Sequence, residues 1–337
     1  MSHGRLIHHN LTSSTDLAHV SLGDLGAELL NRLTKSASHD SRKDLERHLQ
    51  LLTKLHDVTE TLMDVPENRR SVAHFASQFR FAHHCWKTHR IPFQGAVHVD
   101  IGCGSVNPLA RMFTHLMLGA KRIVGIDLDM PTALEESARN LARLASAAIL
   151  DPSRLYGDYP ITSKDVLANL EGFDLAKLQR GDPAGAPPAR MALLQKPIEA
   201  TGLEKASVDV IVSNSVFEHV SDIDATLAEL ARITRPGGFG LHGIDTVDHR
   251  WYGEPHLHQL DFLTIPSKEK IVFGCNRVRL FEFPAYFKRH GFEVLDHWFH
   301  NKIAITPEFR ARLVAPWKSM SDEQLDTTWA QVLIRRV

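Results

Sequence analysis

Hydrophobic residues follow a helical period in the first part of the chain. Up to about residue 92, apolar positions recur every three or four residues, the spacing of one face of a helix. They include Leu45, Leu49, Leu52, Leu55, Val72, Phe75, Phe79 and Ala82. This pattern predicts an N-terminal helical region, residues 1–92, that packs on or caps the remainder of the chain.

From residue 93 to 337 the pattern changes to short apolar runs that alternate with helical stretches. Such alternation predicts an α/β fold in which a doubly wound, mostly parallel sheet of seven strands is covered on both faces. The expected strands are 96–101, 122–127, 190–194, 208–213, 239–244, 292–295 and 331–336. Insertions at about 151–188 and 246–280 interrupt the alternation. Both are expected to leave the carboxyl ends of the core, so they can wall a ligand site at that edge of the sheet.

Composition narrows the class of protein. The 337 residues carry 39 basic and 40 acidic side chains, a net charge of -1, which argues against a nucleic-acid partner. The sequence has no apolar run of about 18 residues and no secretory leader pattern, so we expect no membrane partner. Three cysteines favour a reducing, cytoplasmic location over a disulfide framework. Oligomeric state is left open.

The run Asp100-Ile-Gly-Cys-Gly104 ends the first predicted strand. Glycines at a strand-to-helix turn let the backbone approach a ligand closely. Dinucleotide-binding folds use a related turn with a third glycine, but residue 107 is Asn here. Asp127 ends the second strand, where a carboxylate can accept both hydroxyls of a ribose. The alternative is an aspartate that only caps the next helix.

Four blocks in this order resemble class I S-adenosylmethionine-dependent methyltransferases. They are the segments 100–105, 125–129, 208–220 and 235–238. The resemblance implies S-adenosylmethionine as cofactor, with the glycine loop against its methionine part, Asp127 on the ribose and Leu128 on adenine. The implied cofactor-binding residues are Asp100, Gly102, Cys103, Gly104, Asp127, Leu128, Ile198 and Asn214. One block departs from the family: its usual acidic partner of adenine falls on Pro197, which leaves Ile198 and Glu199 beside the base.

Methyl transfer to a weakly acidic nucleophile needs alignment and a base, a role that histidine suits near neutral pH. His219 follows the fourth strand and His242 lies in the fifth, so both are candidate bases. Each also has a structural reading, as a loop anchor or a satisfied core residue. Asp245 and His249 belong to a polar run after the fifth strand and complete the candidate catalytic group.

The acceptor pocket is expected to draw on the second insertion. Candidate substrate-binding residues are Trp251, Tyr252, Asn276, Arg277 and Arg279. The Asn-Arg-x-Arg run resembles a segment in a subset of bacterial small-molecule methyltransferases. An equally weighted alternative is an internal salt bridge between Asp245 or Asp248 and one of these arginines. His256-x-His258 has no partner motif with established metal spacing, so no metal site is predicted despite 21 histidines in the chain.

The sequence therefore predicts a methyltransferase that modifies an oxygen or nitrogen of a small-molecule metabolite. A non-catalytic subunit that binds S-adenosylmethionine is a second possibility. A nicotinamide-dependent oxidoreductase is a weaker third, because the third glycine of the dinucleotide turn is missing.

Overall fold

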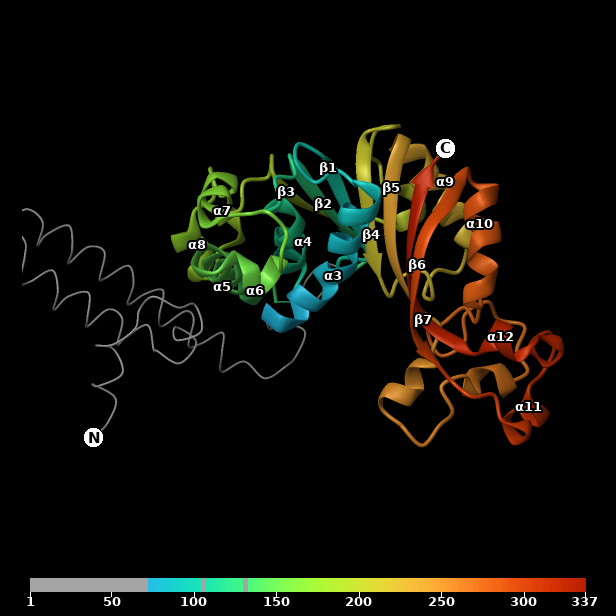
Figure 1. Cartoon of the computed structure of the whole chain (residues 1–337). Helices are drawn as coiled ribbons and strands as arrows, with labels where there is room; N and C mark the ends of the chain where they lie inside the picture. Colours follow the sequence, from blue (N-terminus) through green and yellow to red (C-terminus); the bar gives the residue numbers. More distant parts are fainter. Residues whose placement is uncertain (1–71, 105–106, 130–132) are drawn as a thin grey trace, which may run out of the picture. The chain divides into compact units, whose positions relative to one another are not determined.

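The computed structural model describes residues 72–104, 107–129 and 133–337 (Figure 1). The chain divides into two compact units, Met1–His74 and Phe75–Val337. The second unit contains the sheet, and helix α3 (Val72–His89) leads into it. The helices expected before residue 72 lie outside the described residues, so the N-terminal region stays a prediction.

A seven-stranded sheet organises the second unit, in the order β3-β2-β1-β4-β5-β7-β6. Strands β1 to β5 run parallel, and β7 is antiparallel to both β5 and β6. This confirms the predicted doubly wound, mostly parallel sheet. The strands are β1 (Val97–Ile101), β2 (Arg122–Asp127), β3 (Met191–Gln195), β4 (Val208–Asn214), β5 (Thr234–Asp245), β6 (Phe292–Lys302) and β7 (Thr327–Arg336). The strand order reverses between β1 and β4, the point where open α/β sheets bind ligands.

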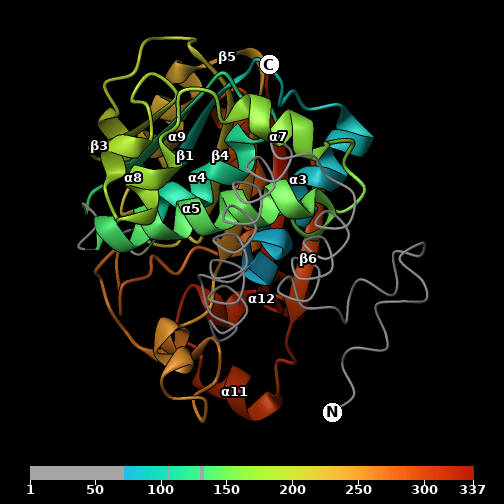
Figure 2. The ribbon, with the colours of Figure 1, turned by 90° about the vertical axis from the view of Figure 1, so that its left-hand side faces the viewer.

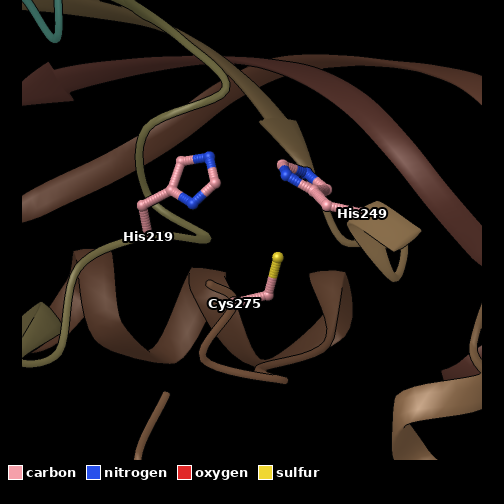
Figure 3. A group of neighbouring side chains, drawn as sticks. All are labelled: His219, His249 and Cys275. Carbon is pink, nitrogen blue, oxygen red and sulfur yellow. The ribbon is translucent and has the colours of Figure 1, made fainter. Parts of the chain in front are cut away.

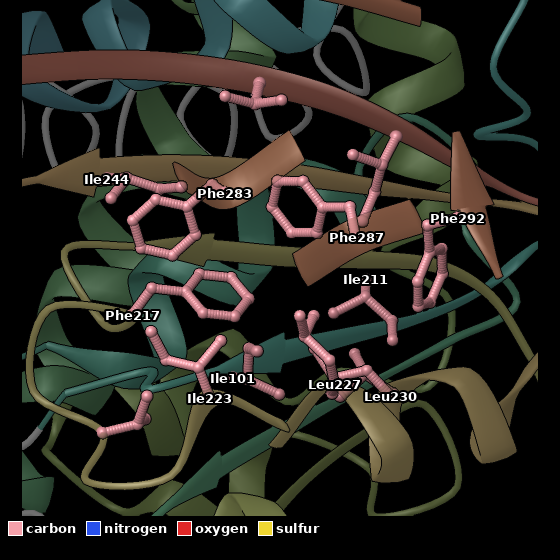
Figure 4. Packing of buried hydrophobic residues seen from close by; sticks show 14 of the residues in the cluster. Ile101, Ile211, Phe217, Ile223, Leu227, Leu230, Ile244, Phe283, Phe287 and Phe292 are labelled. Atoms are coloured by element: carbon pink, nitrogen blue, oxygen red, sulfur yellow. The ribbon is translucent and has the colours of Figure 1, made fainter. Parts of the chain in front are cut away.

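Alternation along β1 explains how the sheet is covered on both faces. Val99 and Ile101 point into an apolar core with Leu227 of α9 (Ile223–Ile233) and Phe287 of α10 (Phe283–Arg289) (Figure 4). The intervening side chains, those of His98 and Asp100, point to the opposite face. There they meet His115 and Arg111 of α4 (Pro108–Leu116), which packs against α5 (Leu134–Leu150).

The insertion 151–188 contains three short helices. Capping by Asp151, Thr162 and Asp174 explains how such short helices begin. They are α6 (Pro152–Tyr156), α7 (Ser163–Asn169) and α8 (Leu175–Gln179), and all three pack on α5 (Figure 2). Neither of the two cavities beside the switch point is lined by this insertion.

The second insertion forms a small core of its own. Residues after β5 pack with the connection between β6 and β7, which contains α11 (Pro307–Arg312) and α12 (Asp322–Leu325). The buried members are Leu260, Phe262, Leu263, Val272, Cys275, Phe309, Leu313, Trp317 and Leu325. Among the helices of the described residues, none is long and apolar enough to cross a membrane.

Candidate cofactor and acceptor site

The glycine loop closes tightly onto the neighbouring strand. The backbone amides of Gly102 and Cys103 donate to the carbonyl oxygen of Ile126, at 2.8 and 3.3 Å. Gly102 and Gly104 have φ angles of 61° and 81°, which favour glycine. A Cβ on Gly102 would lie 2.3 Å from Cγ2 of Val216, whereas one on Gly104 would meet nothing within 4 Å. The loop therefore packs on one side and is open on the other.

Asp127 is held against this loop by backbone amides. Its Oδ2 accepts a hydrogen bond from Gly104 N at 2.8 Å, and its Oδ1 accepts one from Asp129 N at 3.1 Å. A carboxylate oxygen has two lone pairs, so each can still accept a hydroxyl. Asp127 lines a cavity of about 510 Å³ together with Gly102 and Gly104. The position predicted for a ribose ligand thus faces an open space.

Apolar side chains stand at the same cavity. Leu128 is 64% exposed although it is a large hydrophobic residue, and Ile198, in the short turn after β3, lines the cavity with it. A flat aromatic base would cover apolar surface of this kind. Glu199 and Lys196 also line the cavity and supply polar atoms at its edge.

Asp100 lies at a second, smaller cavity of about 60 Å³, which Arg111 and Asn214 also line. Arg111 Nε contacts Asp100 Oδ2 at 3.1 Å, but Asp100 Oδ1 is buried without a hydrogen-bond partner. Burial raises the pKa of Asp100 to about 6, against the opposing charge of Arg111. A buried carboxylate oxygen without a partner fits an incoming ammonium group, such as the one at the methionine end of the expected cofactor.

His219 is the only one of the four candidate catalytic residues that lines either of these two cavities within the described residues. It is exposed, and its Nδ1 lies 2.7 Å from the carbonyl oxygen of Gly274. Because a carbonyl only accepts hydrogen bonds, Nδ1 carries the proton and Nε2 has the free lone pair. Figure 3 shows His219 and His249 on either side of the Cys275 thiol.

His249 and Asp245 form a polar group next to His219. Asp245 is buried; it accepts hydrogen bonds from Val247 N at 2.9 Å and from the Tyr252 hydroxyl, and its Oδ2 lies 3.7 Å from His249 Nε2. Asp245, followed by the Cys275 thiol, raises the pKa of His249 to about 10. A histidine that holds its proton at neutral pH is a poor general base, so these residues better suit a positioning role.

His242 occupies the core, at 1% exposure. Its Nδ1 lies 2.8 Å from Ser213 Oγ, and its ring contacts Phe217 and Phe287. Burial lowers its pKa to about 3. These contacts match the alternative role of His242 as a satisfied core residue. It lines neither of the two cavities.

The Asn-Arg-x-Arg run makes internal contacts. Asn276 Nδ2 donates to the carbonyl oxygens of Phe217 and Val220, at 2.6 and 3.0 Å. Arg277 donates to three backbone carbonyls and lies over the Trp317 ring, and Arg279 donates to Thr246.

The internal salt bridge considered for this run takes a different form. Asp248 pairs with Arg250, at 2.6 Å, and not with Arg277 or Arg279. In the same segment Trp251 is half-buried against Tyr252, and Tyr252 is 61% exposed. Of the expected substrate-binding residues, Tyr252 is thus the most accessible.

Three residues that the sequence did not single out as site residues stand beside the candidates: Arg111, Glu218 and Cys275. An arginine within the mostly apolar helix 108–116 was a usable signal for a buried ion pair. Glu218 is 2% exposed and neither of its carboxylate oxygens has a hydrogen-bond partner. Burial raises the pKa of Glu218 to about 8. Cys275 carries no local signal, because its neighbours come from segments 26 to 56 residues away.

Comparison with known proteins agrees with the fold. Residues 161–241 match a family model described as a methyltransferase domain. No curated protein matches the chain in sequence. Similar solved structures include an S-adenosylmethionine-dependent methyltransferase from Mesorhizobium loti, with 15% identity over 75% of this chain and 97% of that one and a TM-score of 0.39. Another, from Methanosarcina mazei, shares 12% identity over 74% and 96%, with a TM-score of 0.40.

A third similar structure, the [4+2]-cyclase SpnF, shares 14% identity over 76% of this chain and 80% of that one, with a TM-score of 0.39. Residues 161–241 are thus similar to a methyltransferase domain, and the strand order and the glycine loop with Asp127 agree with the predicted resemblance to class I S-adenosylmethionine-dependent methyltransferases.

Proposed function

We propose that this protein transfers the methyl group of S-adenosylmethionine to an oxygen or nitrogen of a small-molecule metabolite. The observation that carries the proposal is the bond from Gly104 N to Asp127 Oδ2, which fixes a carboxylate at the open side of the glycine loop. Cavity, glycine loop and carboxylate lie at the point where the strand order reverses.

Different residues are assigned to each part of the cofactor. Asp127 is assigned to the ribose hydroxyls, and Leu128 with Ile198 to the two sides of adenine. Gly102, Cys103 and Gly104 bring the backbone close to the methionine part. Asp100 and Asn214 are assigned to the amino end, since Asp100 Oδ1 is buried there without a partner. When bound, S-adenosylmethionine supplies a methyl group activated by its sulfonium.

His219 is our candidate for the base that takes the proton of the acceptor. Its Nε2 has the free lone pair, and its side chain lines the larger cavity. The base would take the proton of a hydroxyl while its oxygen bonds to the methyl carbon and the carbon–sulfur bond breaks, or the proton of an ammonium group before its nitrogen attacks. Such proton transfer would raise the rate by roughly 10²–10⁴-fold. Tyr252, exposed beside His249, is a candidate contact for the acceptor.

Transfer of a labelled methyl group tests this function. Wild-type protein incubated with methyl-labelled S-adenosylmethionine and a small-metabolite extract should yield a labelled small molecule. His219→Gln should lower the rate at least tenfold while its affinity for S-adenosylhomocysteine changes little. His256→Gln, an exposed histidine away from the cavities, is the control. Tight cofactor binding without transfer of the label to any molecule of the extract would favour a non-catalytic subunit.

A further inference from the structure

The described residues bring two histidines and a cysteine together beside the cofactor cavity. The residues are His219, His249 and Cys275, shown in Figure 3. Each offers one ligand atom, and the three atoms lie within 4.8 Å of one another. A second group, formed by Glu218 and Asp245 with the same His249, meets the same distance limit. Cys275 is 1% exposed, Glu218 2% and Asp245 4%. Three buried groups that can carry negative charge therefore surround two imidazoles.

We propose that His219, His249 and Cys275 bind a zinc ion at the edge of the cofactor cavity. This is an alternative to the role of His219 as the base, because a nitrogen bound to zinc has no free lone pair. Two imidazole nitrogens and one thiolate are donors that favour zinc over magnesium or calcium. Zinc would displace the proton that His249 otherwise holds, because a metal ligand must be deprotonated. Donor atoms around one zinc lie about 3.3–3.7 Å apart, given bonds of about 2.0–2.3 Å. Closing the group from separations of up to 4.8 Å takes side-chain movements of roughly 1 Å or less, within the range of small χ rotations.

One tight turn both supplies and orients the ligands. Val272 and Cys275 exchange two backbone hydrogen bonds, and Phe273 and Gly274 between them have φ angles of 51° and 80°, as in a type I′ turn. This turn places the Gly274 carbonyl on Nδ1 of His219, which leaves the lone pair of Nε2 for a metal ion. A second hydrogen bond of this kind is how most metal-binding histidines are held.

The segments that carry the ligands are also tied to each other. Asn276 N donates to Glu218 O at 2.7 Å, and the Asn276 amide donates to Phe217 O and Val220 O. The loop with His219 and the turn with Cys275 are therefore joined by three hydrogen bonds independent of any ion. This preformed geometry lowers the ordering cost of binding.

Unpartnered polar atoms point to a missing cation. His249 Nε2 and both carboxylate oxygens of Glu218 are buried without hydrogen bonds. Buried polar groups are nearly always satisfied, by protein, water or an ion. The buried Arg279 directs its Nη1 and Nη2 to Thr246, and its Nε is also buried without a hydrogen bond. A zinc ion would offset the thiolate and the carboxylate beside it, and Glu218 could serve as a fourth ligand.

Zinc titration of the full chain against a chromophoric chelator tests the site. We expect one tightly bound zinc per chain, with affinity at least tenfold lower in His219→Gln, His249→Gln and Cys275→Ser. The matched controls are Cys85→Ser, an equally buried cysteine, and His256→Gln; both should bind zinc like the wild type. Because the chain has 21 histidines, the triple ligand variant sets the background. Equal zinc binding by the wild type and this triple variant would overturn the proposal.

Cobalt(II) binding to the wild-type protein gives a test that does not depend on whether the variants fold. Cobalt bound to wild-type protein should show a thiolate charge-transfer band in the near ultraviolet, removed by added zinc and absent in Cys275→Ser. A cobalt spectrum without that band would contradict the site even if no variant folds. Binding of S-adenosylhomocysteine, measured with a chelator present, separates failure of the metal site from failure of the cofactor site.

Discussion

The amide of Gly104 donates to Oδ2 of Asp127 across 2.8 Å, and this contact joins two segments 23 residues apart in the chain. It aligns the open side of the glycine loop with the end of β2. The same carboxylate accepts from Asp129 N, so its orientation is fixed before a ligand arrives. Such preorganisation is what a ribose site requires, because binding then orders few side chains.

The contact between Gly102 and Val216 makes a prediction about packing. Gly102→Ala would place a Cβ 2.3 Å from Val216 Cγ2 on a residue with positive φ, so we expect a loss of about 1–3 kcal/mol in the free energy of unfolding. Urea denaturation measures it. Gly102→Ala with Val216→Ala relieves the collision but not the backbone strain, and should recover part of the loss. No recovery would mean that the collision is not what limits this position.

Asp100 predicts a pH dependence of cofactor affinity. Its pKa is raised to about 6, so the carboxylate is ionised above this pH and protonated below it. If Asp100 binds the amino group of S-adenosylmethionine, affinity should fall as pH decreases through about 6, whereas Asp100→Asn should be weaker at pH 8 and nearly flat. The α-carboxyl group of the ligand titrates well below this window, and the α-amino group, at about 7.7–8.0, titrates at its upper end for both proteins alike. Calorimetry between pH 5 and 8 decides; identical profiles would remove Asp100 from the site.

His242 predicts a loss of stability in acid. Its folded-state pKa is lowered from 6.5 to about 3, so the unfolded chain binds the proton first. The stabilisation is complete above pH 6.5 and decreases as pH falls from there toward 3, by about 1.4 kcal/mol per pH unit. Buried His98 and His115 have lowered pKa values and add to the slope.

His242→Asn isolates this contribution. In urea denaturation between pH 4 and 5.5, the free energy of unfolding of the variant should change with pH by about 1.4 kcal/mol per unit less than that of wild type. An unchanged slope would mean that His242 is protonated in the folded chain.

The pattern of hydrophobic residues alone predicted the bounds of several parallel strands. Strands β1, β2 and β4 begin and end within a residue or two of the predicted runs, because buried parallel strands are continuously apolar. Strand β6 extends to Lys302, far beyond the predicted 292–295, since its outer half is half-exposed and mixes polar with aromatic residues. Strand β5 begins at Thr234, ahead of the predicted 239, and includes the Arg-Pro-Gly-Gly run at 235–238, where its pairing with β4 shifts register.

The candidate site likewise contains residues whose meeting the sequence predicted and contacts that only the structure shows. Gly102, Gly104 and Asp127 follow strands directly, so position along the chain predicted where they meet. The meeting of His219 with His249 and Cys275 depends on a turn at 272–275 and on side-chain contacts of Asn276, which leave no periodic trace in the sequence. Arginines 277 and 279 looked suited to a ligand by charge alone, and their hydrogen bonds to the protein became visible only with the fold.

Calorimetric titration of wild type and Asp127→Ala with S-adenosylhomocysteine tests the central claim most directly. Loss of hydrogen bonds to a charged acceptor costs about 1.5–3 kcal/mol each, so the variant should bind at least tenfold more weakly. Glu171→Ala, an exposed carboxylate that lines neither cavity, should bind like wild type. Wild-type binding of NADH without binding of S-adenosylhomocysteine, or equal affinity in wild type and Asp127→Ala, would contradict the account.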